Sequence, residues 1–241
     1  MGPFFDMHSH MLCQVDDGAK DRDMMFAMLE AAYANGTRAL CLTPHYSPYL
    51  YGDTSAASAA AFELLCKYTA EHHPDMHLFL GHELGYHSSC LAALESGACR
   101  PIAGSRYVLV DFPAEVDFFE LQNAMGRLRS AGVRTILAHA ERYRCLFRHM
   151  DWIRGYVDDG GLVQLNASSV TGAWGTVAKM QWKRILKADL AHIISSDAHN
   201  LTSRPPDMTV CMPYLQKHCS GRQICDLTWN NAWRVVQNKS F

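Results

Sequence analysis

The first eighteen residues of the chain carry a high density of side chains that bind metal ions. In the segment DMHSHMLCQVDDG, two histidines are separated by one residue, and two consecutive aspartates follow within a short loop. If His8 and His10 lie on a strand, its period of two places both imidazoles on the same side, where one ion could take both. Asp16 or Asp17 could then reach in from the loop, with Gly18 permitting a tight turn.

Further histidines and carboxylates stand at the ends of other short apolar runs. Six of seven strand-like runs end at or just before a His, Asp or Glu. These residues are His8 and His10, His45, Glu83, Asp111, His139, and the pair Asp197 and His199. In a closed parallel barrel the carboxyl ends of all strands meet on one face, and that face holds the active site. We therefore expect these side chains to form one cluster.

The types of these side chains indicate which chemistry the cluster performs. Imidazole and carboxylate without thiolate form the ligand set of Zn, Mn or Fe in hydrolytic sites, not of a closed structural zinc site. The candidate ligands are too many for one ion, so we expect two or three. The nine cysteines are odd in number and form no C-x-x-C. They predict neither a disulfide framework nor a thiolate site, and we expect reduced thiols.

The elements that must position this cluster alternate along the chain. Strand-like runs lie at 4–8, 37–43, 76–82, 106–112, 133–139, 161–166 and 190–196. Helix-like stretches lie near 58–72, 117–131, 147–160, 174–188, 208–219 and 224–238. An earlier one begins at Asp21 or Asp23, carries Met24, Met28 and Ala31 on one face, and ends at Gly36. The alternation predicts βα units and a parallel sheet in a single domain over residues 1–241.

Motifs that are absent from the sequence, and its net charge, reduce the number of possible folds and of possible classes of binding partner. No G-x-G-x-x-G follows the first strand and no P-loop is present, which disfavours a nucleotide-binding sheet and leaves the barrel. The formal net charge is -2, which gives no electrostatic reason to bind nucleic acid or an anionic membrane. No apolar run approaches the roughly 18 residues of a spanning helix, and no basic segment followed by an apolar one begins the chain. We expect a cytoplasmic protein without membrane insertion.

Six motifs in this order carry a resemblance to a known family. They are DMHSHMLCQVDDGAKD, TPH, GHEL, HAERY, QLNASS and SSDAHNLTSRPP. Together they resemble the PHP (polymerase and histidinol phosphatase) superfamily, and more closely the bacterial capsule-type protein-tyrosine phosphatases of the CpsB/YwqE kind. The resemblance covers almost the whole chain. It implies a distorted (β/α)7 barrel with the metal site at the C-terminal ends of the strands, and a metal-dependent hydrolysis of phosphotyrosine.

The resemblance also implies roles for individual residues. Two or three divalent ions are expected, most often manganese, with iron or zinc as alternatives. The first would be held by His8, His10, Glu83 and Asp197, the second by the bridging Glu83 with Asp111 and His139, and the third by Asp17, His45 and His199. The family pattern is what selects Asp17 over Asp16. Arg142 of HAERY and Arg204 of SRPP match two catalytic arginines that grip the phosphate.

Some positions depart from the family pattern or stay open. Asp111 stands where many relatives have Glu, and Cys13-Gln14 replaces a more usual Pro-Gly. His82 stands where a small residue is common, but strand alternation turns it away from Glu83, so we expect a structural role. We expect Glu141 to support other residues and the tryptophans to pack in the interior. Left open are whether Asn166 and Asn200 orient ligands or cap turns, and whether Tyr46, Tyr49 and Tyr51 line the mouth of a cleft.

By the resemblance, the substrate would be the tyrosine-rich tail of a bacterial tyrosine autokinase that controls capsule or exopolysaccharide export. One alternative is a PHP phosphatase for a small phosphomonoester such as histidinol phosphate, against which HAERY and SRPP argue. A second alternative is a non-catalytic module that binds phosphotyrosine. A PHP nuclease is disfavoured by the acidic charge balance.

Overall fold

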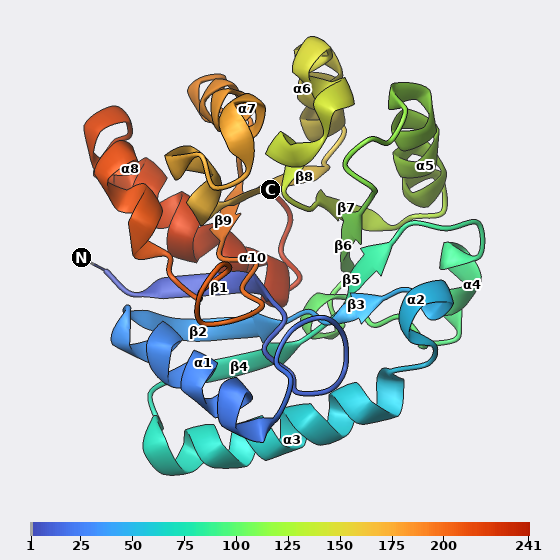
Figure 1. The fold of residues 1–241 in the computed structure, drawn as a ribbon. Helices are drawn as coiled ribbons and strands as arrows, with labels where there is room; N and C mark the ends of the chain where they lie inside the picture. Colours follow the sequence, from blue (N-terminus) through green and yellow to red (C-terminus); the bar gives the residue numbers. More distant parts are fainter. Residues whose placement is uncertain (1) are drawn as a thin grey trace.

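Parallel strands curl around the centre of the molecule and helices cover them from outside (Figure 1). The computed structural model describes residues 2–241. Its strands are β1 (Phe4–Ser9), β2 (Thr37–Leu42), β3 (His45–Tyr46), β4 (His77–Leu80), β5 (Glu83–Gly85), β6 (Tyr107–Asp111), β7 (Arg134–Leu137), β8 (Leu162–Asn166) and β9 (Ile193–Ser195). Each of the seven predicted strand-like runs overlaps one of these strands, and the predicted parallel pairing is confirmed.

Two short strands, β3 and β5, were not predicted as separate elements. The hydrogen-bonded orders are β1-β2-β4 and β3-β5-β6-β7-β8-β9. The break between the two ladders falls at residues 43–44 and 81–82, where Pro44 lacks an N–H and Gly81 packs against Ile102. Two backbone bonds still cross the break, from Gly81 to Leu42 (2.9 Å) and from Glu83 to Pro44 (3.1 Å). The strands therefore continue in direction on both sides of it.

The end of β9 lies beside the end of β1. Ser9 forms a parallel bridge with Ala198. The N–H of Asp197 donates to the carbonyl of His8 (2.9 Å), and the N–H of His10 donates to Ala198 (2.8 Å). The first and last strands thus bring their C-terminal residues to the same place.

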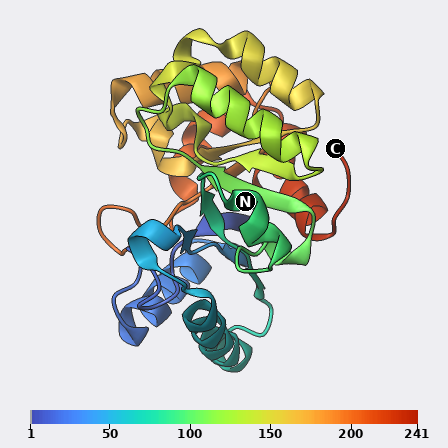
Figure 2. The same cartoon turned by 90° about the vertical axis from the view of Figure 1, so that its right-hand side faces the viewer.

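The helices alternate with the strands as predicted. They are α1 (Arg22–Ala34), α2 (Pro48–Tyr51), α3 (Ser55–His72), α4 (Cys90–Glu95), α5 (Phe118–Ser130), α6 (Met150–Asp158), α7 (Gly175–Lys187), α8 (Met212–His218), α9 (Gly221–Cys225) and α10 (Asn231–Val236). Figure 2 shows the blue and teal helices of the N-terminal part on one side of the strands and the green to orange helices on the other. The short helices α2 and α4 were not predicted. No helix of residues 2–241 combines the length and hydropathy needed to cross a bilayer.

Helix α1 begins where the sequence predicts but turns a slightly different face inward. Asp21 is its N-cap, and its carboxylate accepts the N–H of Met24 at 2.8 Å. Of the predicted face, Met28 is buried and Met24 is partly buried against the same core cluster, whereas Ala31 is not part of that cluster. The buried residues are Met25, Met28, Leu29 and Ala32. The sequence is apolar at both sets of positions, so periodicity alone could not choose between them.

The strands are closely packed beneath the cluster of polar side chains. One core cluster joins residues of seven strands: Phe5, Met7, Ala39, Cys41, Phe79, Leu109, Ile136, Leu162 and Ile193. Trp229 and Trp233 pack against it from the C-terminal helices, with ring centroids 6.4 and 5.2 Å from Phe5. This apolar floor holds the strand ends rigidly, and the expectation that tryptophans pack in the interior is confirmed for these two.

Candidate metal centre

The side chains that the sequence placed at strand ends lie together. Three groups of donor atoms have all members within 4.8 Å of one another: His10 with Asp17, His45 and His199; His8 with His10 and Asp197; and His45 with Glu83 and Asp111. His139 joins them through Nε2, which lies 3.0 Å from Glu83 and 3.4 Å from Asp111. The structure therefore brings together all nine residues of the expected ligand set.

Glu83 occupies the centre of the cluster. Its Oε1 lies 3.2 Å from Nε2 of His8 and 3.0 Å from Nε2 of His139. Its Oε2 lies 3.2 Å from Nε2 of His10 and 3.0 Å from Nδ1 of His45. Burial disfavours the charged carboxylate, but His8 and His45 outweigh it and hold the pKa of Glu83 well below its usual range. Each oxygen thus faces a different pair of imidazoles, which is the arrangement that a bridging carboxylate requires.

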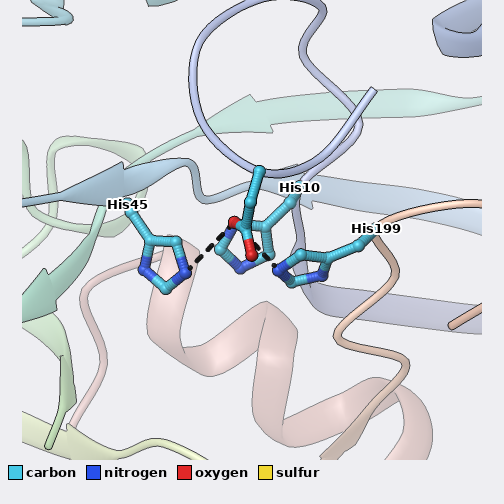
Figure 3. Close-up of side chains that lie close together, drawn as sticks. His10, His45 and His199 are labelled. Atoms are coloured by element: carbon cyan, nitrogen blue, oxygen red, sulfur yellow. Dashed lines mark ion pairs between the residues drawn. The ribbon is translucent and has the colours of Figure 1, made fainter. Parts of the chain in front are cut away.

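A second focus lies around the loop that follows β1. Figure 3 shows the rings of His10, His45 and His199 turned toward a common point. Asp17 meets two of them, at 3.5 Å from Nε2 of His45 and 3.4 Å from Nε2 of His199. The ring centroids of His10 and His199 are only 3.9 Å apart. Imidazoles and a carboxylate packed this closely are arranged as candidate ligands of a shared cation.

The residues present fit divalent cations by their donor chemistry. Glu83 Oε2 and His199 Nε2 are buried and make no hydrogen bond within residues 2–241. Burial alone would lower the pKa of His8, but Glu83 and Asp197 raise it to about 9. Burial likewise opposes the charged form of His45, and Glu83 raises its pKa to about 10. The carboxylates therefore attract positive charge into this buried space, and a metal ion supplies it without protonating the imidazoles.

Asp111 reaches the cluster despite being shorter than Glu. Tyr143 donates its hydroxyl to Oδ1 of Asp111 at 3.1 Å and accepts the N–H of Phe112 at 3.2 Å. Burial and the neighbouring Glu83 raise the pKa of Asp111. Sequence reasoning did not assign a role to Tyr143. Its place in HAERY, four residues after His139, was the available signal.

The two aspartates of the opening loop have different environments. Asp17 faces the imidazoles, whereas Asp16 lies behind them: its Oδ2 is 2.7 Å from Nδ1 of His10 and accepts the N–H of His45 at 2.9 Å. Its other oxygen accepts the N–H of Gly18. A Cβ at Gly18 would lie 1.8 Å from the carbonyl oxygen of His10, so close approach of the backbone, rather than a special φ, requires glycine here.

A polar chain on β8 supports the cluster from below. Gln164 Oε1 lies 3.2 Å from Nδ1 of His8 and accepts the N–H of His139 at 2.7 Å. Gln164 Nε2 donates to Asn166 Oδ1 (2.9 Å), and Asn166 Nδ2 donates to Asp197 (2.7 Å). Asn166 therefore orients a candidate ligand. Gln164 was missed, although its spacing of two from Asn166 on a buried strand was a signal.

The remaining open residues have structural partners. Glu141 accepts bonds from the Ser169 hydroxyl (2.6 Å) and the Asn166 N–H (3.0 Å), which supports its expected secondary role. Asn200 Oδ1 accepts the N–H groups of Thr202, Ser203 and Arg204, so it fixes a turn.

His82 lies apart from the candidate ligands. Its Nδ1 accepts the N–H of Arg100 at 2.9 Å, and burial lowers its pKa to about 4. Its ring lies 5.7 Å from Tyr46 and not in the cluster, as strand alternation predicts. The roles of three tyrosines were left open. Tyr46 is buried, Tyr49 is largely exposed, and Tyr51 stacks on His45 with the ring centroids 5.7 Å apart.

Both predicted arginines stand at the rim of the cluster. Arg204 Nη2 donates to Asp197 Oδ1 at 2.7 Å, and Arg142 Nη1 lies 3.5 Å from Asp197 Oδ2. Their side chains are 23% and 24% exposed, so each side chain is partly open to solvent while it touches the cluster. Trp174 departs from the expectation of interior packing, because it is partly exposed and its ring faces both guanidiniums.

Comparisons with known proteins place this arrangement in a family. The family model described as "Capsular polysaccharide synthesis, CpsB/CapC" matches residues 4–237. The chain belongs to the CpsB/CapC family. The family resemblance that the motifs carry is thereby confirmed.

Relatives of the CpsB/CapC family are similar along nearly their full length. Tyrosine-protein phosphatase CpsB of Streptococcus pneumoniae is 28% identical over 239 residues, covering 97% of this chain and 98% of the relative. Tyrosine-protein phosphatase YwqE of Bacillus subtilis (strain 168) is 27% identical, covering 98% and 92%. A solved structure described among "YwqE from Bacillus subtilis and CpsB from Streptococcus pneumoniae, unique metal-dependent tyrosine phosphatases" has a TM-score of 0.87 at 26% identity, covering 98% of this chain and 96% of that one.

Proposed function

We propose that this CpsB/CapC family protein is a metal-dependent phosphomonoesterase that hydrolyses phosphotyrosine in proteins. The observation that carries the proposal is the position of Glu83 between four imidazoles, with Arg142 and Arg204 at the rim of the same cluster. Family membership over residues 4–237 and the names of the relatives support the same activity.

The proposal includes the arrangement of the fold around the site. Counting β2 with β3 and β4 with β5 as interrupted strands gives seven strand positions, which describes a distorted (β/α)7 barrel in one domain over residues 1–241. The bridge between Ser9 and Ala198 supports closure between the first and last strands. The candidate ligands then stand at the C-terminal ends of the strands, as in other parallel barrels.

The ligand assignment distributes nine residues among three sites. We assign the first to His8, His10, Glu83 and Asp197; the second to Glu83, Asp111 and His139; and the third to Asp17, His45 and His199. His10 also lies within reach of the third group, and His45 of the second. Nitrogen and oxygen ligands without thiolate suit manganese, with iron or zinc as alternatives.

The candidate ligands, the two arginines and the residues that orient the ligands would have different roles in phosphate-ester hydrolysis. Bound divalent ions supply positive charge to the phosphoryl oxygens and lower the pKa of water. Arg142 and Arg204 present planar guanidiniums that match phosphate oxygens bidentately and stabilise the charge that builds in the transition state. Asp16 and Gln164 fix the rings of His10 and His8 through the nitrogens that face away from Glu83. No cysteine precedes an arginine in a C-x5-R pattern, so a thiol nucleophile has no support.

The proposed biological substrate is the tyrosine-rich tail of a bacterial tyrosine autokinase that controls capsule or exopolysaccharide synthesis. We propose that the protein encounters this tail in the cytoplasm. The capsular description of the family supports this setting. The near-balanced charge of the chain supports a protein partner over nucleic acid or a membrane surface.

A side-by-side assay tests the proposal. Purified protein is loaded with Mn and offered a phosphotyrosine peptide, a phosphoserine peptide of the same sequence, and histidinol phosphate, each before and after chelation. Turnover of the phosphotyrosine peptide with clear preference, and its loss on chelation, is the expected result. Preferred hydrolysis of histidinol phosphate indicates the metabolite phosphatase. Tight peptide binding without turnover indicates a binding module, and either outcome overturns the proposal.

A further inference from the structure

Trp174 stands at the rim of the metal centre on a loop shaped by glycine. It lies between the 3-10 turn η4 (Ala167–Thr171) and α7. Gly172 and Gly175, on either side of it, have φ values of 100° and 86°, which side-chain-bearing residues rarely adopt. The loop therefore depends on both glycines to follow this path and to leave the indole partly exposed.

The indole ring contacts both candidate phosphate-binding arginines. The guanidinium carbon of Arg142 lies 4.1 Å from the ring centroid, and that of Arg204 lies 5.2 Å from it. Both distances fall within the roughly 6 Å of a cation–π contact. Arg142 follows β7 and Arg204 follows β9, so the ring joins two segments that are far apart in the sequence.

Each guanidinium otherwise has little to hold it. Asp197 is the carboxylate that both arginines touch, one through each of its oxygens. Nε of Arg204 is buried and makes no hydrogen bond within residues 2–241. Each guanidinium donates to Asp197 through one nitrogen only, so Asp197 constrains only one end of each group. The aromatic ring that lies near both groups is that of Trp174.

A stacked ring is well suited to this task. A hydrogen-bonding neighbour would fix a guanidinium by occupying N–H groups that the phosphate needs. An aromatic face holds the guanidinium through its flat side and leaves the N–H edges free for bidentate binding. One ring that holds two guanidiniums also fixes the distance between them.

We propose that Trp174 is a positioning residue that sets the planes and spacing of Arg142 and Arg204 for a phosphoryl group. The inference rests on the proposed function, because it takes these two arginines as the groups that hold the phosphate. Trp174 acts through the arginines and need not touch the phosphorus or the leaving group.

Substitutions at one position test this role. Trp174→Phe keeps an aromatic face, Trp174→Leu keeps bulk without one, and Trp174→Ala removes both. Val177→Ala is the matched control, because Val177 is 45% exposed on α7, three residues further along the chain. For the Mn-loaded proteins we measure metal content, melting temperature, kcat and KM on a phosphotyrosine peptide, and the Kd of inorganic phosphate by calorimetry.

The expected result separates positioning from mere packing. Trp174→Leu and Trp174→Ala should lose roughly tenfold in kcat/KM and in phosphate affinity, with metal content unchanged. Trp174→Phe should recover most of both, and Val177→Ala should match the unmodified protein. Equal phosphate affinity in Trp174→Leu and the unmodified protein overturns the inference. If Trp174→Ala does not fold, the comparison of Leu with Phe decides the question by itself.

A double-mutant cycle checks that the effect passes through the arginines. Trp174→Leu is combined with Arg142→Ala, and phosphate affinity is measured for all four proteins. Non-additive losses are expected, because the ring has one guanidinium fewer to position. Strictly additive losses contradict the inference. Failure of the unmodified protein to hydrolyse phosphotyrosine would contradict the proposed function instead, since phosphate binding tests the role of Trp174 separately.

Discussion

Nδ1 of His10 lies 2.7 Å from the carboxylate of Asp16, while Nε2 of the same ring faces Glu83 at 3.2 Å. The two nitrogens of His10 are thus used differently. Asp16 holds the proton on Nδ1, which leaves Nε2 as the free electron pair for a cation. Asp16 also accepts the N–H of His45, so one buried carboxylate fixes parts of two candidate ligands.

Substituting Asp16 should weaken metal binding without removing a site. In Asp16→Asn the carboxamide no longer enforces the tautomer of His10, so we expect metal affinity to fall by about 10- to 100-fold. The number of ions bound at saturation should not change. Asp17→Asn is the comparison, because it removes a candidate ligand and should lower that number. Competition with a fluorescent chelator measures both quantities. An unchanged affinity in Asp16→Asn would show that His10 does not need this partner.

The hydroxyl of Tyr143 should support Asp111. Tyr143→Phe removes the bond to Asp111 and leaves the N–H of Phe112 without this acceptor, so we expect a loss of about 1–3 kcal/mol in the free energy of unfolding and weaker metal binding. Tyr156→Phe is a matched control: its buried hydroxyl lies 2.9 Å from the Thr135 hydroxyl and donates to the Thr135 carbonyl, away from the cluster. It should lose stability while keeping its metal. Equal metal affinity in both variants would contradict the role of Tyr143.

Metal affinity should rise with pH across the neutral range. Burial opposes protonation of His8, but Glu83 and Asp197 raise its pKa to about 9, so the metal-free protein carries a proton there at neutral pH. A metal ion must displace that proton. Affinity should therefore increase as pH rises through the neutral range toward about 9, above which His8 no longer carries the competing proton. Calorimetry in buffers of different ionisation enthalpy counts the protons released. Affinity that is flat or falls over this window would rule out protonated imidazole in the free site.

Chelation should abolish activity, whereas thiol alkylation should not. None of the nine cysteines belongs to the three groups of donor atoms. Burial raises the pKa of Cys99 and of Cys211 to about 12, so these thiols stay protonated and unreactive at neutral pH. We expect Mn to restore a chelated sample and iodoacetamide to leave its rate unchanged. Full activity in a sample shown to be metal-free by elemental analysis would contradict metal-dependent hydrolysis.

The sequence predicted which candidate ligands lie together better than it predicted the residues that hydrogen-bond to them. His8, Glu83 and Asp197 could be found because strand periodicity and the parallel arrangement decide which residues reach one face. Gln164 and Tyr143 were missed, because an amide or a phenol on a buried segment is compatible with many partners and its position in the sequence does not select one of them. Its partner depends on the twist and register of neighbouring strands, which are set by packing across the whole sheet.

The same limit explains the differences in the elements. Pro44 and Gly81 are visible as interruptions, but the sequence does not say that the ladder resumes beyond them as β3 and β5. The inward face of α1 was also misassigned, since Met24 and Met25 satisfy apolar periodicity equally well. Met25 is a fully buried member of the core cluster that includes Leu40, Leu42 and Leu65, whereas Met24 packs against that cluster while partly exposed. The local hydrophobic pattern predicts that a helix or strand forms, but packing between segments distant in the sequence determines which of its faces is buried.

Glu83 and Arg204 should fail in different ways when substituted. Glu83→Ala removes the carboxylate between four imidazoles and should lose both metal and activity. Arg204→Ala should keep its metal and melting temperature and lose about 10²–10³ in kcat, as expected for one charge-stabilising donor. Arg204→Lys should recover only part of the lost kcat, because the point charge of an ammonium group cannot bind two phosphate oxygens bidentately. Arg127→Ala, on the exposed side of α5, is the control and should behave as the unmodified protein. Metal content, melting temperature and phosphotyrosine turnover are measured on each variant. Normal turnover in Arg204→Ala would mean that this arginine only pairs with Asp197 and that the phosphate is held elsewhere.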